Sequence, residues 1–179
     1  MLLTGLLPDI TSDPAIETAT DSIEVGRSGT IVAPVGIRPP LLAAVATRAA
    51  TPLVVLTATG RDAETLTNAL ASWIPGVAML PAWETLPHER LSPQVDTMAR
   101  RIAVLRRLVH PIAGDESAGA ISVLVVPIRA FLQPIISGLA DLEPVRVRKG
   151  DILDLTETTN RLAELGYERV DMVEGRGQM

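Results

Sequence analysis

The feature that most constrains the fold is an alternation of short apolar runs with longer stretches of helical spacing. The four apolar runs are residues 30–34, 53–57, 77–80 and 121–126. Each has the length of a strand, and most are closed by proline or glycine. Parallel strands need a crossover segment between them, usually a helix. The pattern therefore predicts an α/β fold, with a parallel sheet covered by helices on its faces.

The predicted helices follow these runs at residues 38–50, 60–73, 92–109 and 128–136. In the first of them Pro39 and Pro40 fall in the opening turn, where a missing N–H does no harm. In residues 92–109, Ser92 is expected to be the N-cap and Pro93 the first helical residue. Its apolar stripe is predicted at Val95, Met98, Ile102, Leu105 and Val109, and Asp96 is predicted to pair with Arg100.

Composition excludes several classes of site. Aromatic residues make up 2% of the chain, so there is little on which nucleic-acid bases could stack. The net charge of −5 argues against a surface built mainly to bind DNA. There are no cysteines, which excludes disulfides and thiolate metal sites, and the two histidines have no zinc-ligand set around them. We therefore expect no metal and no cofactor.

The apolar segments are too short to cross a membrane. Residues 1–8 lack a basic region and are shorter than any span, and the longest apolar run, residues 120–128, is strand length. We expect a soluble cytoplasmic protein without membrane contact.

The sequence texture predicts three parts. Residues 1–29 are expected to be an irregular lead-in with at most one short helix, and residues 30–140 the α/β domain. Residues 141–179 are interpreted as the truncated start of a small α+β domain. This last part is predicted to contain a half-exposed strand at 143–149, a helix that begins at Asp154 or Thr156 and ends before Gly166, and a strand at 167–173.

The sequence lacks a phosphate-binding loop where this architecture would carry one. Such a loop reads GxxxxGK[ST] between a strand and a helix, and its backbone N–H groups and lysine hold the phosphates. Here residues 34–40 contain the single glycine Gly36 and two prolines without N–H, and the only lysine of the chain is Lys149. We expect no nucleotide at this turn. A small-ligand or nucleotide site elsewhere, at the carboxyl ends of the strands, stays open as an alternative.

Three stretches resemble the bacterial transcription-repair coupling factors. Residues 83–96, WETLPHERLSPQVD, are similar to a WETLP…SP…D segment of that family. Residues 161–171, RLAELGYERVD, are similar to its LxxLGYxRVD run, and residues 53–62 resemble actinobacterial members. The likeness keeps order and spacing over residues 30–179, but the chain lacks the family's RGG segment, which would begin near Gln178.

The resemblance implies a degenerate, UvrB-like and helicase-like interaction module from the N-terminal region of such a factor. Its implied partner is UvrA, with weak or absent binding because the RGG segment is missing. The remaining parts of the family's proteins bind RNA polymerase and translocate on double-stranded DNA with ATP. No segment of that motor lies in this sequence, so the chain is not expected to be an enzyme.

No catalytic residue is predicted, and the candidate contact residues are basic. Arg146, Arg148, Lys149 and Arg169 lie in the part that the resemblance assigns to UvrA recruitment. Arg100 and Arg107 belong to a positive cluster with Arg90, Arg101 and Arg106, which would contact phosphates or an acidic partner or else form a solvated face. Trp83 is expected to be a core anchor rather than an interface residue, and His88 a surface residue rather than an acid–base group.

Overall fold

The computed structural model describes residues 3–21, 28–85, 94–175 and 177–179. These residues contain a sheet of three parallel strands in the order β1-β3-β2. The strands are β1 (Leu53–Thr57), β2 (Val77–Met79) and β3 (Val123–Pro127). Val123 of the middle strand pairs with Leu53 on one side and with Val77 on the other. The predicted α/β class and parallel sheet are confirmed.

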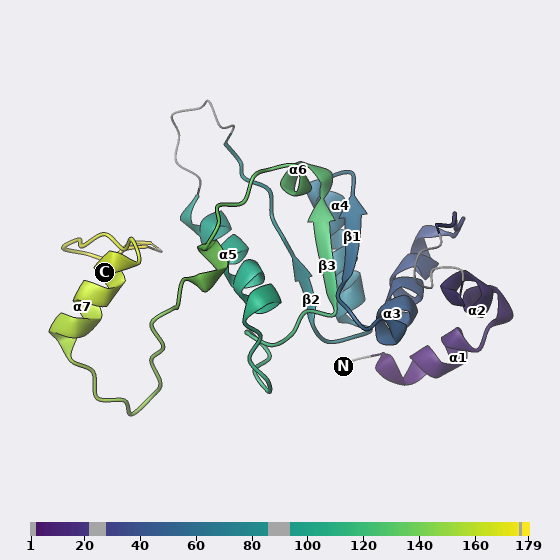
Figure 1. Ribbon diagram of the computed structural model, residues 1–179, viewed down its shortest axis with the longest axis horizontal. Coiled ribbons are helices and arrows are strands. Elements are labelled where there is room, and N and C mark those ends of the chain that lie inside the picture. Colours follow the sequence, from purple (N-terminus) through teal and green to yellow (C-terminus); the bar gives the residue numbers. More distant parts are fainter. Residues whose placement is uncertain (1–2, 22–27, 86–93, 176) are drawn as a thin grey trace.

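Helices surround the sheet and extend beyond it along one long axis (Figure 1). The α-helices are α1 (Leu7–Thr11), α2 (Pro14–Asp21), α3 (Arg38–Arg48), α4 (Gly60–Ala71), α5 (Val95–Val109), α6 (Ile128–Phe131) and α7 (Leu155–Glu164). Three single-turn 3-10 helices join them: η1 (Thr4–Leu6), η2 (Val35–Ile37) and η3 (Leu139–Asp141). Figure 1 places α2 at one end, the sheet in the middle and α7 at the other end.

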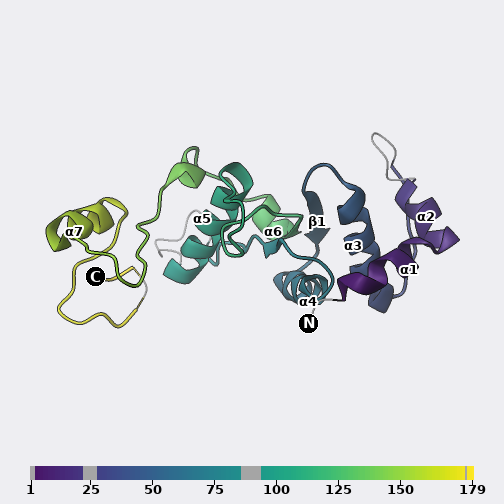
Figure 2. The same cartoon turned by 90° about the horizontal axis from the view of Figure 1, so that it is seen from below.

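Two apolar clusters lie on opposite faces of the sheet. On one face, Leu70 of α4 and Ala43 and Ala46 of α3 pack with Val123 and Val125 of β3. On the other face, Val104 of α5 and Ala130 of α6 pack with Ala78, Leu124 and Val126. Viewed from below in Figure 2, α3 and α4 lie near β1, whereas α5 lies at the far side of α6. Because β3 faces both clusters, all five of its residues are buried.

Most predicted elements of the domain are confirmed with small shifts at their ends, but the helix predicted at residues 128–136 already ends at Phe131. Residues 53–57 form β1, and residues 77–80 and 121–126 correspond to β2 and β3. Thr59 caps α4 by accepting a hydrogen bond from the Asp62 amide, and Pro39 and Pro40 lie in the first turn of α3. Asp154 caps α7, and Gly166 follows its end with a φ of 87°.

The predicted strand at residues 30–34 is wrong. These residues have no regular structure, and the Val32 side chain is 96% exposed. Both edges of the middle strand are already paired, and Pro34 has no N–H for a ladder. β1 and β2 stand at the two edges of the sheet, but residues 30–34 pair with neither of them.

The two strands predicted beyond residue 141 are also wrong. Residues 142–148 have no regular structure, and residues 167–173 contribute a single bridge, between Glu168 and Gln178. There the Glu168 N–H donates to the Gly177 carbonyl at 2.8 Å, and the Met179 N–H donates to the Glu168 carbonyl at 2.9 Å. Neither segment joins the three-stranded sheet of the described residues.

The first residues are more ordered than predicted, since α1 and α2 are both helices. Leu7 is 5% exposed and belongs to the core cluster of α3 and α4. The Leu3 N–H donates to the Ser72 carbonyl, and the Thr4 hydroxyl donates to the Trp73 carbonyl, each at 2.7 Å. The segment is therefore attached to the end of α4.

Helix α5 buries a different face from the predicted one. It begins at Val95 after Gln94 at the N-cap, and the predicted cap residues Ser92 and Pro93 lie outside the described residues. Its buried residues are Thr97, Arg101, Val104 and Leu105. Of the predicted stripe, Val95, Met98 and Val109 are at least 38% exposed. The buried face is turned by roughly a quarter of a turn, at 3.6 residues per turn.

None of the described helices is long and apolar enough to span a membrane.

The Leu70→Ala variant tests the core between α4 and the sheet. Leu70 is 0% exposed, so the substitution removes its contacts and leaves a cavity. We expect the free energy of unfolding to fall by about 2–5 kcal/mol in urea denaturation. Ile152→Ala, at a residue 101% exposed, is the control and should change it by less than about 0.5 kcal/mol. Equal effects of the two substitutions would contradict this assignment of the core.

Candidate binding cleft at the carboxyl edge of the sheet

A cleft lies where the carboxyl ends of the three parallel strands meet. Its volume is about 440 Å³, and its walls include Met79 at the end of β2 and Pro127 at the end of β3. Its polar side chains are Thr59, Glu64, Glu84, Thr97, Arg100 and Arg129. Parallel α/β folds bind ligands at this edge, because loops and helix starts converge there. The cleft is therefore the candidate binding site.

The first wall is the turn between β1 and α4. Thr57 ends the strand, and its hydroxyl donates to the Thr59 carbonyl at 3.0 Å. The Thr59 hydroxyl accepts from the Asp62 N–H at 3.1 Å and donates to the Asp62 carboxylate at 2.7 Å. These local bonds fix the start of α4 at Gly60, with Thr59 and Gly60 on the cleft wall.

The second wall joins Glu84 to α5 and α6. Thr97, which is 8% exposed, donates its hydroxyl hydrogen bond to the Glu84 carboxylate, and Arg129 donates to the Glu84 carbonyl at 3.1 Å. The Thr97 hydrogen bond lowers the pKa of the Glu84 carboxyl below its ordinary value, against a smaller opposing effect of burial. A charged carboxylate thus stands on the wall at neutral pH.

Arg100 brings a positive charge to the same wall. Its guanidinium lies 2.8 Å from the Asp96 carboxylate, as the spacing of four residues on a helix predicts. Both side chains are exposed, so this pair contributes little to stability and leaves Arg100 accessible from the cleft. Of the six predicted contact residues, Arg100 alone lines the cleft.

Arg101, the next residue, is fully buried behind this wall. Its Nη1 donates to the Pro81 carbonyl at 2.6 Å, and its guanidinium carbon lies 4.5 Å from the centre of the Trp83 ring. Burial lowers the pKa of Arg101 from its ordinary value. The Nε atom has no hydrogen-bond partner among the described residues. Arg101 therefore holds residues 81–83, which follow β2, against α5.

Trp83 is held in place from its backbone. Its N–H donates to the Gln133 side-chain oxygen at 2.8 Å, and its carbonyl accepts from the Gln133 side-chain nitrogen at 3.2 Å. Trp83 is half-buried, with its ring over Arg101. It is neither the core anchor that was predicted nor a free interface residue, because its ring covers a buried cation.

The structure does not gather the predicted arginine cluster of α5 into one surface. Arg107 donates through Nε to the Gly119 carbonyl at 2.8 Å, and Arg106 donates to the Leu142 carbonyl at 3.1 Å. These bonds hold loops against α5. Arg90 and His88 lie outside the described residues.

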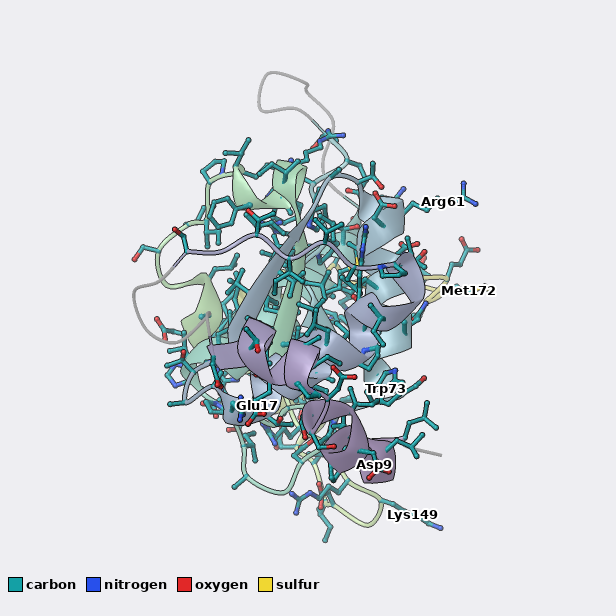
Figure 3. The ribbon with its side chains drawn as sticks, turned by 90° about the vertical axis from the view of Figure 1, so that its right-hand side faces the viewer. Asp9, Glu17, Arg61, Trp73, Lys149 and Met172 are labelled. Atoms are coloured by element: carbon teal, nitrogen blue, oxygen red, sulfur yellow. The ribbon has the colours of Figure 1, made fainter. Side chains whose placement is uncertain are left out.

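The four basic candidates beyond residue 141 lie away from the cleft. Arg146 and Arg148 are exposed on the extended segment, and Arg169 is exposed after α7. Lys149 extends from a turn, away from the rest of the molecule (Figure 3). Their role in partner binding stays a prediction.

Sequence reasoning named Arg101 only as part of a positive cluster and missed its burial, and it missed the Glu84–Thr97 pair. A signal for Arg101 is present, since residues 97, 101, 104 and 105 share one helix face and Trp83 precedes the helix. The link between Glu84 and Thr97 has no signal in sequence spacing, because a separation of 13 residues fits no periodic element.

The chemistry of the cleft is that of a binding surface. It presents two carboxylates and two guanidinium groups, and the Thr97 and Thr59 hydroxyls are already bonded to carboxylates. Among the described residues there is no group of three histidine, cysteine, aspartate or glutamate side chains that could hold a metal ion. The arrangement suits a ligand that has both polar and charged groups.

Fold and cleft together define an α/β module with a parallel sheet, consistent with a helicase-like domain. No protein-family model matches the chain. The transcription-repair-coupling factors of Mycobacterium tuberculosis and Mycobacterium bovis are each 46% identical to it over 151 residues, which are 83% of this chain. The Escherichia coli factor is 27% identical over 140 residues, 77% of this chain. The chain spans 12% of the length of these relatives.

The chain therefore belongs, as a segment, to the family of transcription-repair coupling factors. The resemblance expected from residues 53–62, 83–96 and 161–171 is confirmed by these relatives.

The adjacent residues Arg101 and Arg100 give a matched pair of variants. Arg101→Ala removes a buried cation, leaves the Pro81 carbonyl unpaired and uncovers Trp83. We expect it to lower the free energy of unfolding by about 2–4 kcal/mol in urea denaturation followed by tryptophan fluorescence. Arg100→Ala breaks an exposed pair and should cost less than about 1 kcal/mol. Similar decreases in the free energy of unfolding for both variants would show that Arg101 does not hold the segment after β2 against α5.

Thr97→Val tests whether the Thr97 hydrogen bond lowers the pKa of Glu84, since valine keeps the shape of the buried side chain and removes its hydroxyl. We expect the Glu84 pKa to rise toward its ordinary value of 4.5, measured by NMR titration of its carboxyl carbon. Because the folded pKa is lowered, the stability gained from Glu84 is present above the ordinary value and is lost as the pH falls through the lowered one. That loss should be absent in the variant. An unchanged Glu84 pKa would show that Thr97 is not its main cause.

Proposed function

We propose that the chain is a non-catalytic interaction module of transcription-coupled nucleotide excision repair, whose partner is UvrA. The observation that carries the proposal is the 46% identity to mycobacterial transcription-repair-coupling factors over 83% of the chain. The degenerate UvrB-like character and the UvrA partner come from the resemblance of residues 83–96 and 161–171. In the whole protein, displacement of stalled RNA polymerase by ATP-driven translocation on DNA would belong to other segments, in the cytoplasm.

The turn before α3 supports a module without nucleotide chemistry. In nucleotide-binding α/β domains, free N–H groups at a helix start hold the phosphates. Here η2 leads into α3, and Pro39 and Pro40 remove two N–H groups from its first turn. Residues 30–34 form no strand that would aim the turn at a ligand. The same positions in a phosphate-binding loop would carry glycines, lysine and a hydroxyl.

The exposed basic residues beyond residue 141 are the proposed contacts with UvrA. Arg146, Arg148, Lys149 and Arg169 are all exposed, and Val147 beside them is 60% exposed. An extended segment with exposed cations and one apolar side chain suits an acidic protein surface. Arg107 is the weaker candidate, because its guanidinium already binds the Gly119 carbonyl.

Capture of purified UvrA by the immobilised chain tests the proposal. We expect weak capture by the 179-residue chain and clear capture by a version extended by about one domain length of the mycobacterial sequence. Arg148→Glu in the extended version should weaken capture at least about tenfold, since a reversed charge meets an acidic surface. Arg61→Glu, at an exposed arginine on the first turn of α4, is the matched control and should leave capture unchanged. Capture by neither version would refute UvrA recruitment.

The cleft supports a second candidate, a domain that binds a small ligand or nucleotide at the carboxyl edge of the sheet. The melting temperature of the same chain separates the two candidates, because a ligand that binds the folded state raises it. We expect no rise with ATP, GTP or dinucleotides in the presence of Mg²⁺. A rise that Arg129→Ala abolishes would favour the ligand-binding domain.

A further inference from the structure

The end of η3 and the residues that follow it are held against the end of α5 by two side chains of that helix end. Arg106 donates through Nη1 to the Leu142 carbonyl at 3.1 Å, and its Nη2 lies 3.9 Å from the Glu143 carboxylate. His110 Nε2 lies 2.7 Å from Asp141 Oδ1. Three consecutive residues are thus bound at one helix end. We call these five residues the α5 clamp.

The two helical members of the clamp differ in how firmly they hold. Arg106 and His110 are four residues apart, so they lie on one face of the helix. The Arg106 side chain is only 19% exposed, and its Nε is buried without a hydrogen-bond partner among the described residues. Burial leaves it few rotamers. The pair of His110 and Asp141 is exposed and contributes less. Arg106 is therefore the firmer half of the clamp.

Beyond the clamp, little else orients the chain. Residues 144–153 contain no helix or strand, and Figure 1 shows the chain running from the side of α5 to α7. Within the part of the chain that the structure describes, no hydrogen bond or salt bridge joins residues 144–153 to the α/β domain. A weak attraction remains: the pKa of Asp115 is lowered mainly by a hydrogen bond from Ser117, and the charge of Arg146 adds the smallest part. The direction of the segment is therefore set mainly by the clamp.

The segment that leaves the clamp carries three of the proposed UvrA contacts. Arg146, Arg148 and Lys149 follow Glu143 by three to six residues. A turn gives the segment a local shape, since the Arg148 N–H donates to the Asp151 carboxylate at 2.7 Å. An extended chain advances by at most about 3.3–3.6 Å per residue, so the three cations lie within roughly 10–20 Å of the clamp along the chain. A change of direction at the clamp would move them by a similar distance.

We propose that Arg106 and His110 are positioning residues for this basic segment. They fix the direction in which Arg146, Arg148 and Lys149 leave the α/β domain and meet a partner. The inference rests on the proposed function, because UvrA is the partner that these cations would contact. A segment that is already held loses less conformational freedom when it binds, and therefore binds more tightly. The clamp touches no partner itself and acts through the segment.

Pulsed electron paramagnetic resonance on the 179-residue chain measures this positioning without a partner. The chain has no cysteine, so Asn68→Cys on α4 and Val147→Cys on the segment, both at exposed residues, accept one spin label each. We expect one narrow distribution of distances between the labels. Arg106→Gln combined with His110→Ala should broaden it toward roughly 10 Å, the span of four flexible residues.

Two further variants show whether the effect belongs to the clamp. Arg106→Lys keeps a charged donor near Leu142 and Glu143 and should keep the distribution narrow. Arg100→Gln removes a guanidinium of the same helix that pairs with Asp96, and it should change nothing.

Asp141→Ala combined with Glu143→Ala opens the clamp from its exposed side. The two side chains are 67% and 72% exposed, so the variant is expected to fold, which circular dichroism checks. The same broadening is expected. A distance distribution that stays narrow in both combined variants would overturn the proposal.

Capture of purified UvrA by the extended version then separates this inference from the proposed function. Both combined variants should weaken capture about three- to tenfold, because the released segment must be ordered on binding. Arg106→Lys should restore most of the capture, and Arg61→Gln, at an exposed arginine of α4, should leave it unchanged. Capture that the clamp variants do not weaken would overturn the positioning role while UvrA recruitment stands. Absence of capture by the unaltered extended version would refute UvrA recruitment, and this role with it.

Discussion

The structure depends on the burial of β3 between two parallel neighbours and two helical layers. All five residues from Val123 to Pro127 are buried, with β1 and β2 paired at the edges. Leu70 and the α3 alanines cover one face, and Val104 and Ala130 cover the other. Each helical layer packs side chains against this strand, so β3 fixes the positions of α3, α4, α5 and α6. The carboxyl ends of all three strands then meet at one edge, and the cleft follows from that convergence.

A second constraint is the burial of Arg101, which connects this sheet to the cleft wall. Burying a cation is costly unless polar groups and a ring surround it, and Pro81 and Trp83 provide them. The interaction fixes the segment after β2 against α5. The same helix presents Thr97 to Glu84 and Arg100 to the cleft. Arg101 thereby helps to position the side chains that a ligand or partner would contact in the cleft.

Sequence reasoning succeeded where local patterns decide structure. The runs at 53–57 and 77–80 form β1 and β2, because short apolar runs between breakers suit a covered parallel sheet. It failed at 30–34, 143–149 and 167–173, where the local pattern favours a strand but the segment does not pair with the sheet, and pairing is not encoded in a local pattern. It also chose the wrong face of α5, since it treated Arg101 as a polar residue although its stem and guanidinium are buried. For the cleft, it named Arg100 but neither Glu84, as a cleft wall, nor Arg129.

The sequence by itself determined the class of fold, the positions of α3, α4 and α7, and the family. Helix propensity, capping residues and sequence identity to relatives can all be read from the residues themselves, without any tertiary contact. It also determined that the turn at Gly36 lacks the residues of a phosphate-binding loop. Only the tertiary structure decided which arginine is buried, which strands stand at the edges of the sheet and which carboxylate receives the Thr97 hydroxyl. Those outcomes depend on contacts between residues far apart in the chain, and no local pattern contains them.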